Sequence, residues 1–176
     1  MSKVTIIIPY KNNLKYLFSA LESIFLQTYK NLKILIIYDD EDLSDLKNIK
    51  NFINKKKIKK FYSVKIYVNK KNLGAGESRN IGIKFSKSKY IAFLDSDDEW
   101  KKNKIELQLK FMEKYQIPIS HTSYFEINEQ GNKIGVRKAK KILNYQDILN
   151  SCDIGLSTVM LNLKFLKKNN FKFPNI

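Results

Sequence analysis

The first half of the chain alternates continuous apolar runs with stretches in which apolar residues recur every three or four positions. The runs are typical of strands buried on both faces, and the wider spacing is typical of helices that bury one side. The predicted strands cover residues 4–8, 32–38, 64–68 and 90–94. The predicted helices cover residues 14–25 and 43–53 and a short segment around 81–85. Strands that alternate with helices predict an α/β fold with a Rossmann-like, mostly parallel central sheet and helices on both faces.

From Trp100 onward the pattern is looser. It predicts a helix around 105–112, a strand over 117–127 that ends in a turn at 129–132, a short helix at 145–149 and a last strand at 159–163. The sequence contains no internal repeat and no linker rich in Gly, Pro or Ser. We therefore expect one domain over residues 1–176.

The chain is strongly basic, with 33 Lys+Arg against 17 Asp+Glu and a net charge of +16. The segment from Lys47 to Lys71 holds ten lysines and no acid. We interpret it first as a solvated face, and the alternative is attraction to anionic lipid headgroups, at about 1 kcal/mol per well-placed lysine. No nucleic-acid partner is expected, because that reading would rest on charge alone.

No apolar run approaches the roughly 18 residues needed to span a bilayer. The single cysteine, Cys152, cannot form an internal disulfide, and the first 15 residues do not follow the order of a secretory signal. These features predict a cytoplasmic protein. If the lysine-rich segment binds anionic lipids, the protein would lie peripherally at the inner face of the membrane.

Polar clusters follow three of the predicted parallel strands. They are Pro9 to Asn12, Asp39 with Asp40, and Asp95 to Asp98. Because the carboxyl ends of parallel strands share one edge of the sheet, the three clusters are expected to converge on a ligand site. The alternative is that all three are ordinary loop residues or helix caps.

The Asp95, Ser96, Asp97, Asp98 cluster is the strongest local signal. Three carboxylates in four residues repel one another unless a cation or hydrogen bonds neutralise them. Oxygen ligands select hard ions, so the cluster predicts Mg²⁺ or Mn²⁺. No cluster of His and Cys favours zinc, and His121, the only histidine, is interpreted as a structural residue of a strand.

The segment NLGAGESRNIG, residues 72–82, places Gly74 and Gly76 in a predicted loop and Arg79 in the first turn of the following helix. Glycines allow close approach of a ligand to the backbone, and a guanidinium offers two donors to phosphate oxygens. The segment is neither a GxGxxG nor a Walker A sequence, so dinucleotide oxidoreductases and ATPases are disfavoured.

Two long segments then carry a resemblance to a known family. The sequences VTIIIPYKNNLKYLFSALESIFLQTYKNLKILIIYDD and NLGAGESRNIGIKFSKSKYIAFLDSDDEW resemble the family-2 glycosyltransferases, which are inverting enzymes of the GT-A fold. The resemblance runs from Val4 to about Trp100. It implies a DxD motif at Asp95 and Asp97 that binds Mn²⁺ or Mg²⁺, with Asp97 as the expected ligand. The nucleotide-sugar-binding residues that it implies are Pro9, Tyr10, Lys11, Asn12, Asp39, Asp40, Arg79, Asp95, Ser96 and Asp97.

The resemblance also implies a function. A sugar would pass from a nucleotide diphosphate donor, such as a UDP-sugar, to a glycan or lipid-linked acceptor in bacterial surface polysaccharide or lipooligosaccharide synthesis. Residues 1–100 would bind the donor, and residues 101–176 would begin the acceptor side. Lys11 stands where the family commonly has an aromatic residue, and Glu41 with Asp42 replaces the usual Gly-Ser.

The general base of the reaction has no assigned residue. Family members continue past an FKFP-like segment, here Phe171 to Pro174, into an acidic motif that supplies this base. The sequence ends at Ile176. The resemblance therefore implies that the base lies beyond Ile176 and that the acceptor side is C-terminally incomplete. Asp153 and Glu126 are the acids to consider within the sequence. A truncated, non-catalytic module that binds nucleotide-sugars is the alternative.

Overall fold

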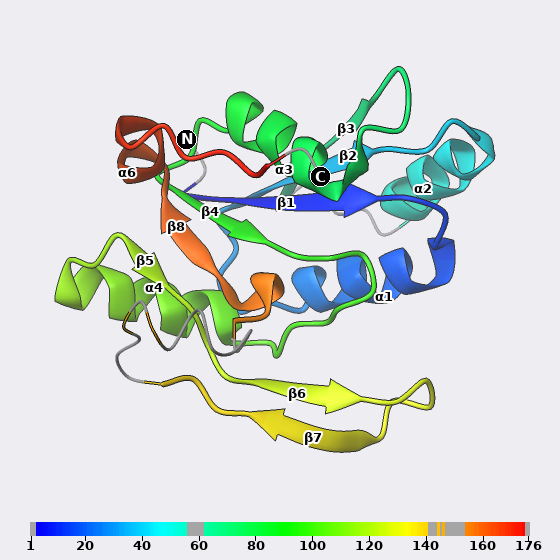
Figure 1. Ribbon diagram of the computed structural model, residues 1–176. Coiled ribbons are helices and arrows are strands. Elements are labelled where there is room, and N and C mark those ends of the chain that lie inside the picture. The colour runs from blue at the N-terminus through cyan, green and yellow to red at the C-terminus, as the bar shows by residue number, and fades with distance from the viewer. Residues whose placement is uncertain (1–2, 56–61, 141–143, 145, 147–153, 175–176) are drawn as a thin grey trace.

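The computed structural model describes residues 3–55, 62–140, 144, 146 and 154–174. It has a central six-stranded sheet in the order β3-β2-β1-β4-β8-β5 (Figure 1). β3, β2, β1 and β4 are parallel, whereas β8 runs antiparallel to both β4 and β5. The strands are β1 (Val4–Tyr10), β2 (Leu32–Tyr38), β3 (Tyr62–Val68), β4 (Tyr90–Phe93), β5 (Ile119–Ser120) and β8 (Met160–Asn162). The prediction of a mostly parallel sheet is confirmed.

Helices cover both faces of this sheet, as the continuous apolar runs predict. In β1, Ile6 and Ile8 pack against α1 (Leu14–Phe25), α2 (Ser44–Lys55) and α4 (Lys104–Tyr115). The intervening Ile7 packs on the other face with α3 (Gly74–Phe85) and α6 (Leu163–Lys168). Successive side chains of a strand point to opposite faces of the sheet. When both faces are covered, all of these side chains are buried, so the strand is a continuous apolar run.

Helix α3 is longer than predicted. The expected loop at Gly74 and Gly76 is wrong, because both glycines lie in the first turn of a 12-residue helix and Arg79 follows in the second turn. Gly74 has a φ of +82°, which suits a residue without a Cβ where the chain enters the helix. The main-chain N–H of Leu73 donates to Asp39 Oδ1 at 2.8 Å, so a buried carboxylate fixes the start of α3.

The predicted strand over 117–127 is also wrong. It is divided into β5 and β6 (Tyr124–Ile127), and residues 121–123 belong to neither strand. β5 pairs with β8 in the main sheet, whereas β6 pairs with β7 (Lys133–Arg137) in a separate two-stranded sheet. The chain leaves the main sheet between them. β7 and α6 were not predicted, and the helix expected at 145–149 lies outside the described residues except for Gln146.

Candidate functional site

The three polar clusters of the sequence meet at one edge of the sheet, as expected. They lie where β1, β2 and β4 end. The N–H of Asp39 donates to the carbonyl of Tyr10 at 2.8 Å, which joins the ends of β1 and β2. The N–H of Leu94 donates to the carbonyl of Ile7 at 3.1 Å, which places the Asp95–Asp98 segment beside the same edge. We call this edge, with its loops at 10–13, 39–42 and 95–99, the donor edge.

The first cluster presents side chains of two kinds. Pro9 and Tyr10 are buried, while Lys11 and Asn12 are exposed. The hydroxyl of Tyr10 donates to Asp45 Oδ2 and accepts from the N–H of Asn13 at 3.3 Å. Burial, together with the bond to Asp45, raises the pKa of the Tyr10 phenol, which therefore stays neutral. A ligand at this edge could reach the exposed side chains of Lys11 and Asn12.

The second cluster separates into a buried and a partly exposed carboxylate. Asp39 is 3% exposed and accepts hydrogen bonds from Asn69 Nδ2 at 2.7 Å and from the N–H of Leu73 at 2.8 Å. Asp40 is partly exposed and accepts only a local hydrogen bond, from the N–H of Asp42 at 3.2 Å, among the contacts that the structure shows. Asp39 therefore holds the loop before α3, and Asp40 presents a carboxylate to the donor edge.

Asp42, which follows this pair by two residues, has a structural role. Asp42 accepts from the N–H of Ser44 at 2.8 Å and from its hydroxyl at 2.9 Å, at the first residue of α2. This interaction lowers the pKa of Asp42. A carboxylate at this position satisfies a free helix N–H and interacts favourably with the helix dipole. Asp42 therefore serves α2 rather than a ligand.

Arg79 connects α3 to the acidic loop after β4. Its Nη2 forms an ion pair with Asp95 Oδ1, and only 14% of the Arg79 side chain is exposed. The guanidinium also lies 5.6 Å from the ring centroid of Phe173. Two hydrogen bonds join Phe173 to Asn80. The N–H of Phe173 donates to Asn80 Oδ1 at 2.9 Å, and Asn80 Nδ2 donates to the carbonyl of Phe173 at 3.0 Å. The segment around Phe173 thus lies against α3 and restricts Arg79 to the geometry that meets Asp95.

The Asp95–Asp98 segment forms a turn in which the N–H of Asp98 donates to the carbonyl of Asp95 at 3.1 Å. Ser157 Oγ accepts from the N–H of Asp95 at 3.0 Å, which ties the turn to the 3₁₀ helix η2 (Leu156–Thr158). Asp97 is exposed. Partial burial raises the pKa of Asp98, and the neighbouring charges of Asp95 and Asp97 add to the rise, while a hydrogen bond with Ser157 opposes it.

This donor set fits a hard divalent cation that is completed by a substrate. Within the described residues, no three His, Cys, Asp or Glu side chains form a ready cluster for a metal. Mg²⁺ is usually bound by one or two carboxylates plus substrate phosphates, so two carboxylates one residue apart suffice. The carboxylates of Asp95, Asp97 and Asp98 lie within four residues of one turn, and a cation bound there would offset their mutual repulsion.

Several residues that shape the site were not found from the sequence. Trp100 is buried, donates from Nε1 to the carbonyl of Ser157 at 2.7 Å, and receives Lys104 Nζ at 4.0 Å from its ring centroid. Asn69 bridges Asp39 and Ser78, at 2.7 and 3.2 Å. Among these residues only Trp100 could have been noticed in the sequence, because it is the single tryptophan and closely follows the acidic motif. The Ser157 and Asn69 contacts depend on tertiary structure and leave no local pattern.

Two further residues considered from the sequence lie outside the three loops of the donor edge. His121 lies between β5 and β6 rather than in a strand, its Nδ1 is buried without a hydrogen-bond partner, and burial lowers its pKa. Glu126 Oε1 pairs with Arg137 Nε at 2.9 Å on the β6–β7 hairpin. The ion pair occupies the Glu126 carboxylate, so Glu126 is not placed to act as the base at the donor edge.

Other predictions fall on residues outside the described ones. Asp153, the second acid considered as a base, lies outside them, and so does Ile176, beyond which the base is expected. The expectation of a base beyond Ile176 therefore stays a prediction. Part of the Lys47–Lys71 segment, residues 56–61, also lies outside the described residues.

The sequence profile described as Glycosyl transferase family 2 matches residues 5–172. The chain belongs to glycosyl transferase family 2. The resemblance seen in the sequence is therefore confirmed, and the match extends well beyond Trp100.

Among its relatives, an uncharacterized glycosyltransferase of Rickettsia felis is 43% identical over 97% of this chain and 27% of its own length. The Escherichia coli protein WfaP is described as UDP-Glc:alpha-D-GlcNAc-diphosphoundecaprenol beta-1,3-glucosyltransferase. It is 38% identical over all of this chain and 66% of its own length. The chain thus spans about a quarter of the Rickettsia protein and about two thirds of the E. coli protein.

Solved structures show the same fold. The UDP complex of TarS 1-349 from S. aureus superposes with a TM-score of 0.78 over 98% of this chain and 50% of that chain, at 22% identity. The mannosyltransferase PcManGT of Pyrobaculum calidifontis, in complex with GDP-Man and Mn²⁺, gives 0.71 over 98% of this chain and 48% of that chain, at 12% identity. The fold of this family-2 chain is that of the GT-A glycosyltransferases. Of the helices that the structure describes, none has the length and apolar character to cross a membrane.

Proposed function

We propose that the chain binds a UDP-sugar at the donor edge and forms the donor half of an inverting, metal-dependent glycosyltransferase. The observation that carries this proposal is the convergence of Asp40, Arg79–Asp95 and Asp97 where parallel strands end, in a chain of this family. The UDP-Glc named for two E. coli relatives favours UDP-glucose as the first donor to test.

The roles of individual residues follow from their environments. Asp40 accepts hydrogen bonds from the uracil or ribose, because its carboxylate is partly exposed. Arg79 acts mainly as a positioning residue, since its side chain is largely buried and holds Asp95. The main chain at Pro9 and Tyr10, with Lys11, Asn12 and Ser96, lines the rest of the nucleotide site.

Asp97, with help from Asp95, would hold Mn²⁺ or Mg²⁺ against the donor diphosphate. When bound, such an ion stabilises negative charge on the departing nucleoside diphosphate. The chain's own contribution is to hold both carboxylates in one turn, through Arg79 on one side and Ser157 on the other.

The acceptor is proposed to be lipid-linked, because two E. coli relatives are described as acting on a diphosphoundecaprenol acceptor. On this proposal the protein acts at the inner face of the membrane in surface polysaccharide synthesis. Inversion requires a base that removes the proton of the acceptor hydroxyl. No described residue is assigned to that role.

Calorimetry with UDP tests the donor site. We expect Mn²⁺ to strengthen UDP binding to the unmodified chain and Asp97→Ala to abolish that strengthening. Glu99→Ala is the matched control, because Glu99 is an exposed acid two residues away and outside the DxD motif. Equal UDP affinity with and without Mn²⁺ in the unmodified chain would contradict the proposed metal site.

A single-turnover assay with labelled UDP-glucose and a lipid-linked acceptor separates an enzyme from a non-catalytic binding module. Transfer by the chain requires a base among its own residues. Metal-dependent UDP binding without transfer supports the module.

A further inference from the structure

The β6–β7 hairpin carries four large apolar side chains that are each at least 43% exposed. Phe125 and Val136 are paired across the two strands and are 43% and 53% exposed. Ile127, two residues from Phe125 on the same strand, is 48% exposed, and Ile134, at the irregular position of β7, is 68% exposed. An isolated two-stranded sheet is marginally stable in water, so four exposed large apolar side chains on it call for a partner.

The opposite face of the hairpin looks toward the rest of the protein. Tyr124 packs against Gly155, where an added Cβ would stand 3.4 Å from its ring. Glu126 lies over Gly135 and pairs with Arg137 on this inner face. Because side chains alternate along a strand, Phe125, Ile127 and Val136 point away from it. We call Phe125, Ile127, Ile134 and Val136 the hairpin apolar face.

Cationic side chains border this face. Lys133 Nζ and Lys101 Nζ lie 4.2 and 5.6 Å from the ring centroid of Phe125. Lys138 and Lys140 follow in the sequence directly after the end of β7. Apolar side chains surrounded by lysines are typical of protein surfaces that bind the interface of an anionic bilayer. The methylene groups of the lysines lie along the apolar region, and their ammonium groups contact lipid phosphates.

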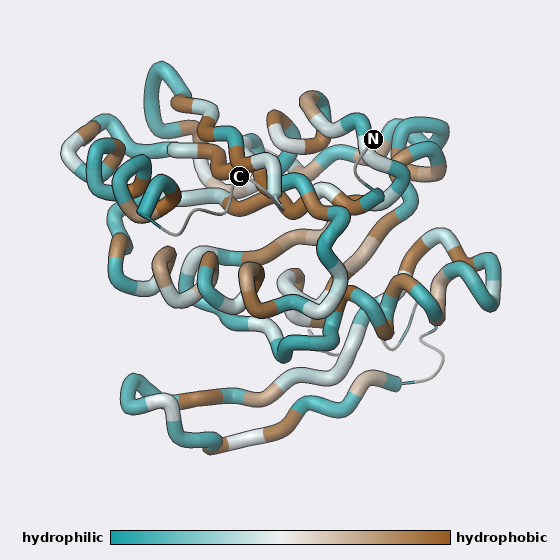
Figure 2. Tube along the Cα trace, turned by 180° about the vertical axis from the view of Figure 1, so that it is seen from behind, coloured by the Kyte–Doolittle hydropathy of each residue, from teal (hydrophilic) through white to brown (hydrophobic). Residues whose placement is uncertain are grey.

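The hairpin is also close to the donor edge. Lys101, which contacts Phe125, follows the acidic turn at 95–98 by three residues. On the inner face, Tyr124 contacts Gly155, and Ser157, two residues later, accepts from the N–H of Asp95. In Figure 1 the β6–β7 turn lies on the same side of the molecule as the arrowhead of β1, and Figure 2 shows apolar stretches on both strands of the hairpin.

We propose that the hairpin apolar face and its lysine border dock the protein on an anionic phospholipid bilayer. The proposal rests on the lipid-linked acceptor of the proposed function, because it brings the donor edge close to the surface in which that acceptor would be anchored.

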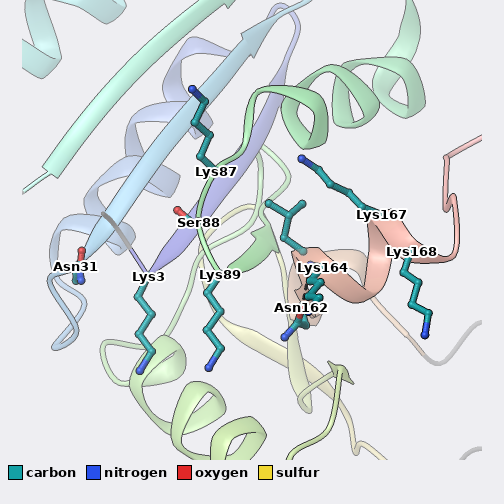
Figure 3. Close-up of a pocket in the computed structure, with 10 residues that line it drawn as sticks. Lys3, Asn31, Lys87, Ser88, Lys89, Asn162, Lys164, Lys167 and Lys168 are labelled. Atoms are coloured by element: carbon teal, nitrogen blue, oxygen red, sulfur yellow. Dashed lines mark hydrogen bonds between the residues drawn. The ribbon is translucent and has the colours of Figure 1, made fainter.

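A second basic surface lies at the opposite edge of the sheet and is the other candidate for contact with a bilayer. A groove of about 930 Å³ is lined by six lysines that come from three separate segments (Figure 3): Lys3, Lys87, Lys89, Lys164, Lys167 and Lys168. It lies where the parallel strands begin, since Lys3 precedes β1 and Lys89 precedes β4. The seven residues of β1 span about 23 Å, so a bilayer at this groove would hold the donor edge away from a membrane-anchored acceptor.

Flotation with vesicles tests the proposal without nucleotide. The unmodified chain should float with vesicles of phosphatidylcholine and 30% phosphatidylglycerol at low salt, and much less with phosphatidylcholine alone. Phe125→Ser with Val136→Ser should weaken partitioning about tenfold, because both side chains would leave the bilayer interface. Leu26→Ser with Phe111→Ser is the matched control, since these residues are 70% and 51% exposed on α1's C-terminal cap and on α4.

Lys133→Gln with Lys138→Gln should also weaken binding to the anionic vesicles, whereas Lys164→Gln with Lys167→Gln, in the groove, should leave it unchanged. An Ile134→Trp variant reports insertion directly, because the one native Trp is buried. Its fluorescence should shift to the blue and be quenched by brominated lipids.

Three results would overturn the proposal: no flotation of the unmodified chain, loss of flotation in the groove variant rather than the hairpin variants, or a hairpin-dependent dimer in light scattering with no vesicle binding. Calorimetry of the hairpin variants with UDP and Mn²⁺ keeps the two proposals separate. Normal UDP binding by a chain that does not float contradicts the docking alone, whereas flotation without UDP binding contradicts the proposed function alone.

Discussion

Asp39 and Asp40 are neighbours in the sequence, but their carboxylates have different environments. Asp39 is buried and holds Asn69 and the start of α3, while Asp40 is partly exposed at the donor edge. A pair of aspartates after a strand does not reveal which of the two faces outward. The structure shows that Asp40 is the one that faces outward, whereas the family resemblance implies both aspartates for ligand binding.

We expect Asp39→Ala and Asp40→Ala to separate stability from ligand binding. Asp39→Ala should lower the free energy of unfolding by about 3 kcal/mol, because it removes two hydrogen bonds to a buried charge. Asp40→Ala should leave stability unchanged and weaken UDP binding by about 1.5 to 3 kcal/mol, which is roughly ten- to a hundredfold. Urea unfolding and UDP calorimetry check both variants, and a fully stable Asp39→Ala variant would contradict this assignment.

Lys104 is a buried cation at the first residue of α4. Its Nζ has no hydrogen-bond partner and lies 4.0 Å from the ring centroid of Trp100. Burial lowers the pKa of Lys104 to about 7 from an ordinary value of 10.5. The folded protein therefore loses this proton near pH 7, while the unfolded chain keeps it until near pH 10.5.

The lowered pKa of Lys104 makes the free energy of unfolding depend on pH. Between those two pH values the unfolded chain binds more protons, so the free energy of unfolding should rise with pH. Relative to Lys104→Met, the unmodified chain should gain about 2 kcal/mol between pH 6.5 and pH 9, because one pKa unit corresponds to about 1.4 kcal/mol. Urea unfolding of both proteins at the two pH values measures the difference, and parallel pH profiles would show that the folded pKa is unshifted.

At the scale of elements, the contact between α3 and β1 sets the position of Arg79. Gly82 lies one turn after Arg79 and faces Ile7, whose Cγ2 would stand 2.4 Å from a Cβ added at Gly82. Ile7 is fully buried and β-branched, so its side chain cannot move aside. The glycine therefore lets α3 approach β1 closely enough for Arg79 to reach Asp95.

Gly82→Ala should destabilise the fold by about 1 to 3 kcal/mol through overpacking. Ile7→Ala alone should cost about 2 to 5 kcal/mol through the cavity that it leaves. The double variant should lose at least about 1 kcal/mol less than the sum of the two, because the new methyl group fills part of that cavity. A double-mutant cycle from urea unfolding tests this coupling, and strict additivity would mean that α3 relaxes away from β1.

The regular elements were predictable because their apolar pattern is dictated by what covers them. In β1 and β2 nearly every position is apolar where both faces are covered, and α1 shows clear helical spacing. The pattern fails where tertiary contacts decide the structure. Gly74 and Gly76 favour a loop locally, yet α3 begins there because Asp39 holds the N–H of Leu73.

The same distinction applies to the site. Asp95, Asp97 and Asp40 could be found because a carboxylate after a buried strand stands out in the sequence. Ser157 and Phe173 come from segments more than 60 residues further along the chain than the residues they hold, Asp95 and Asn80. Their sequence contexts are ordinary, and only the fold brings them to the donor edge.

For the molecule as a whole, charge is unevenly distributed. Eight of the 17 acids lie in two donor-edge segments, residues 39–42 and 95–99. Lysines gather at the opposite edge, around the groove of Figure 3. At the proposed donor site these acids would repel a diphosphate unless a cation were present, in line with the metal dependence proposed above. The whole chain carries a net charge of +16, and its excess of positive side chains causes repulsion between like charges in the folded protein.

This repulsion predicts how salt changes stability. The ion pairs of Lys3 with Glu113 and of Lys110 with Glu106 are partly exposed, so screening them should cost little. Screening the excess of positive charge should instead raise the free energy of unfolding by about 1 to 2 kcal/mol between 10 and 200 mM NaCl. The rise should level off near 0.2 M, where the screening length falls to about 7 Å. Urea unfolding across a NaCl series distinguishes this plateau from the continuing rise of a salting-out effect, and a fall in stability with salt would show that attractive pairs dominate.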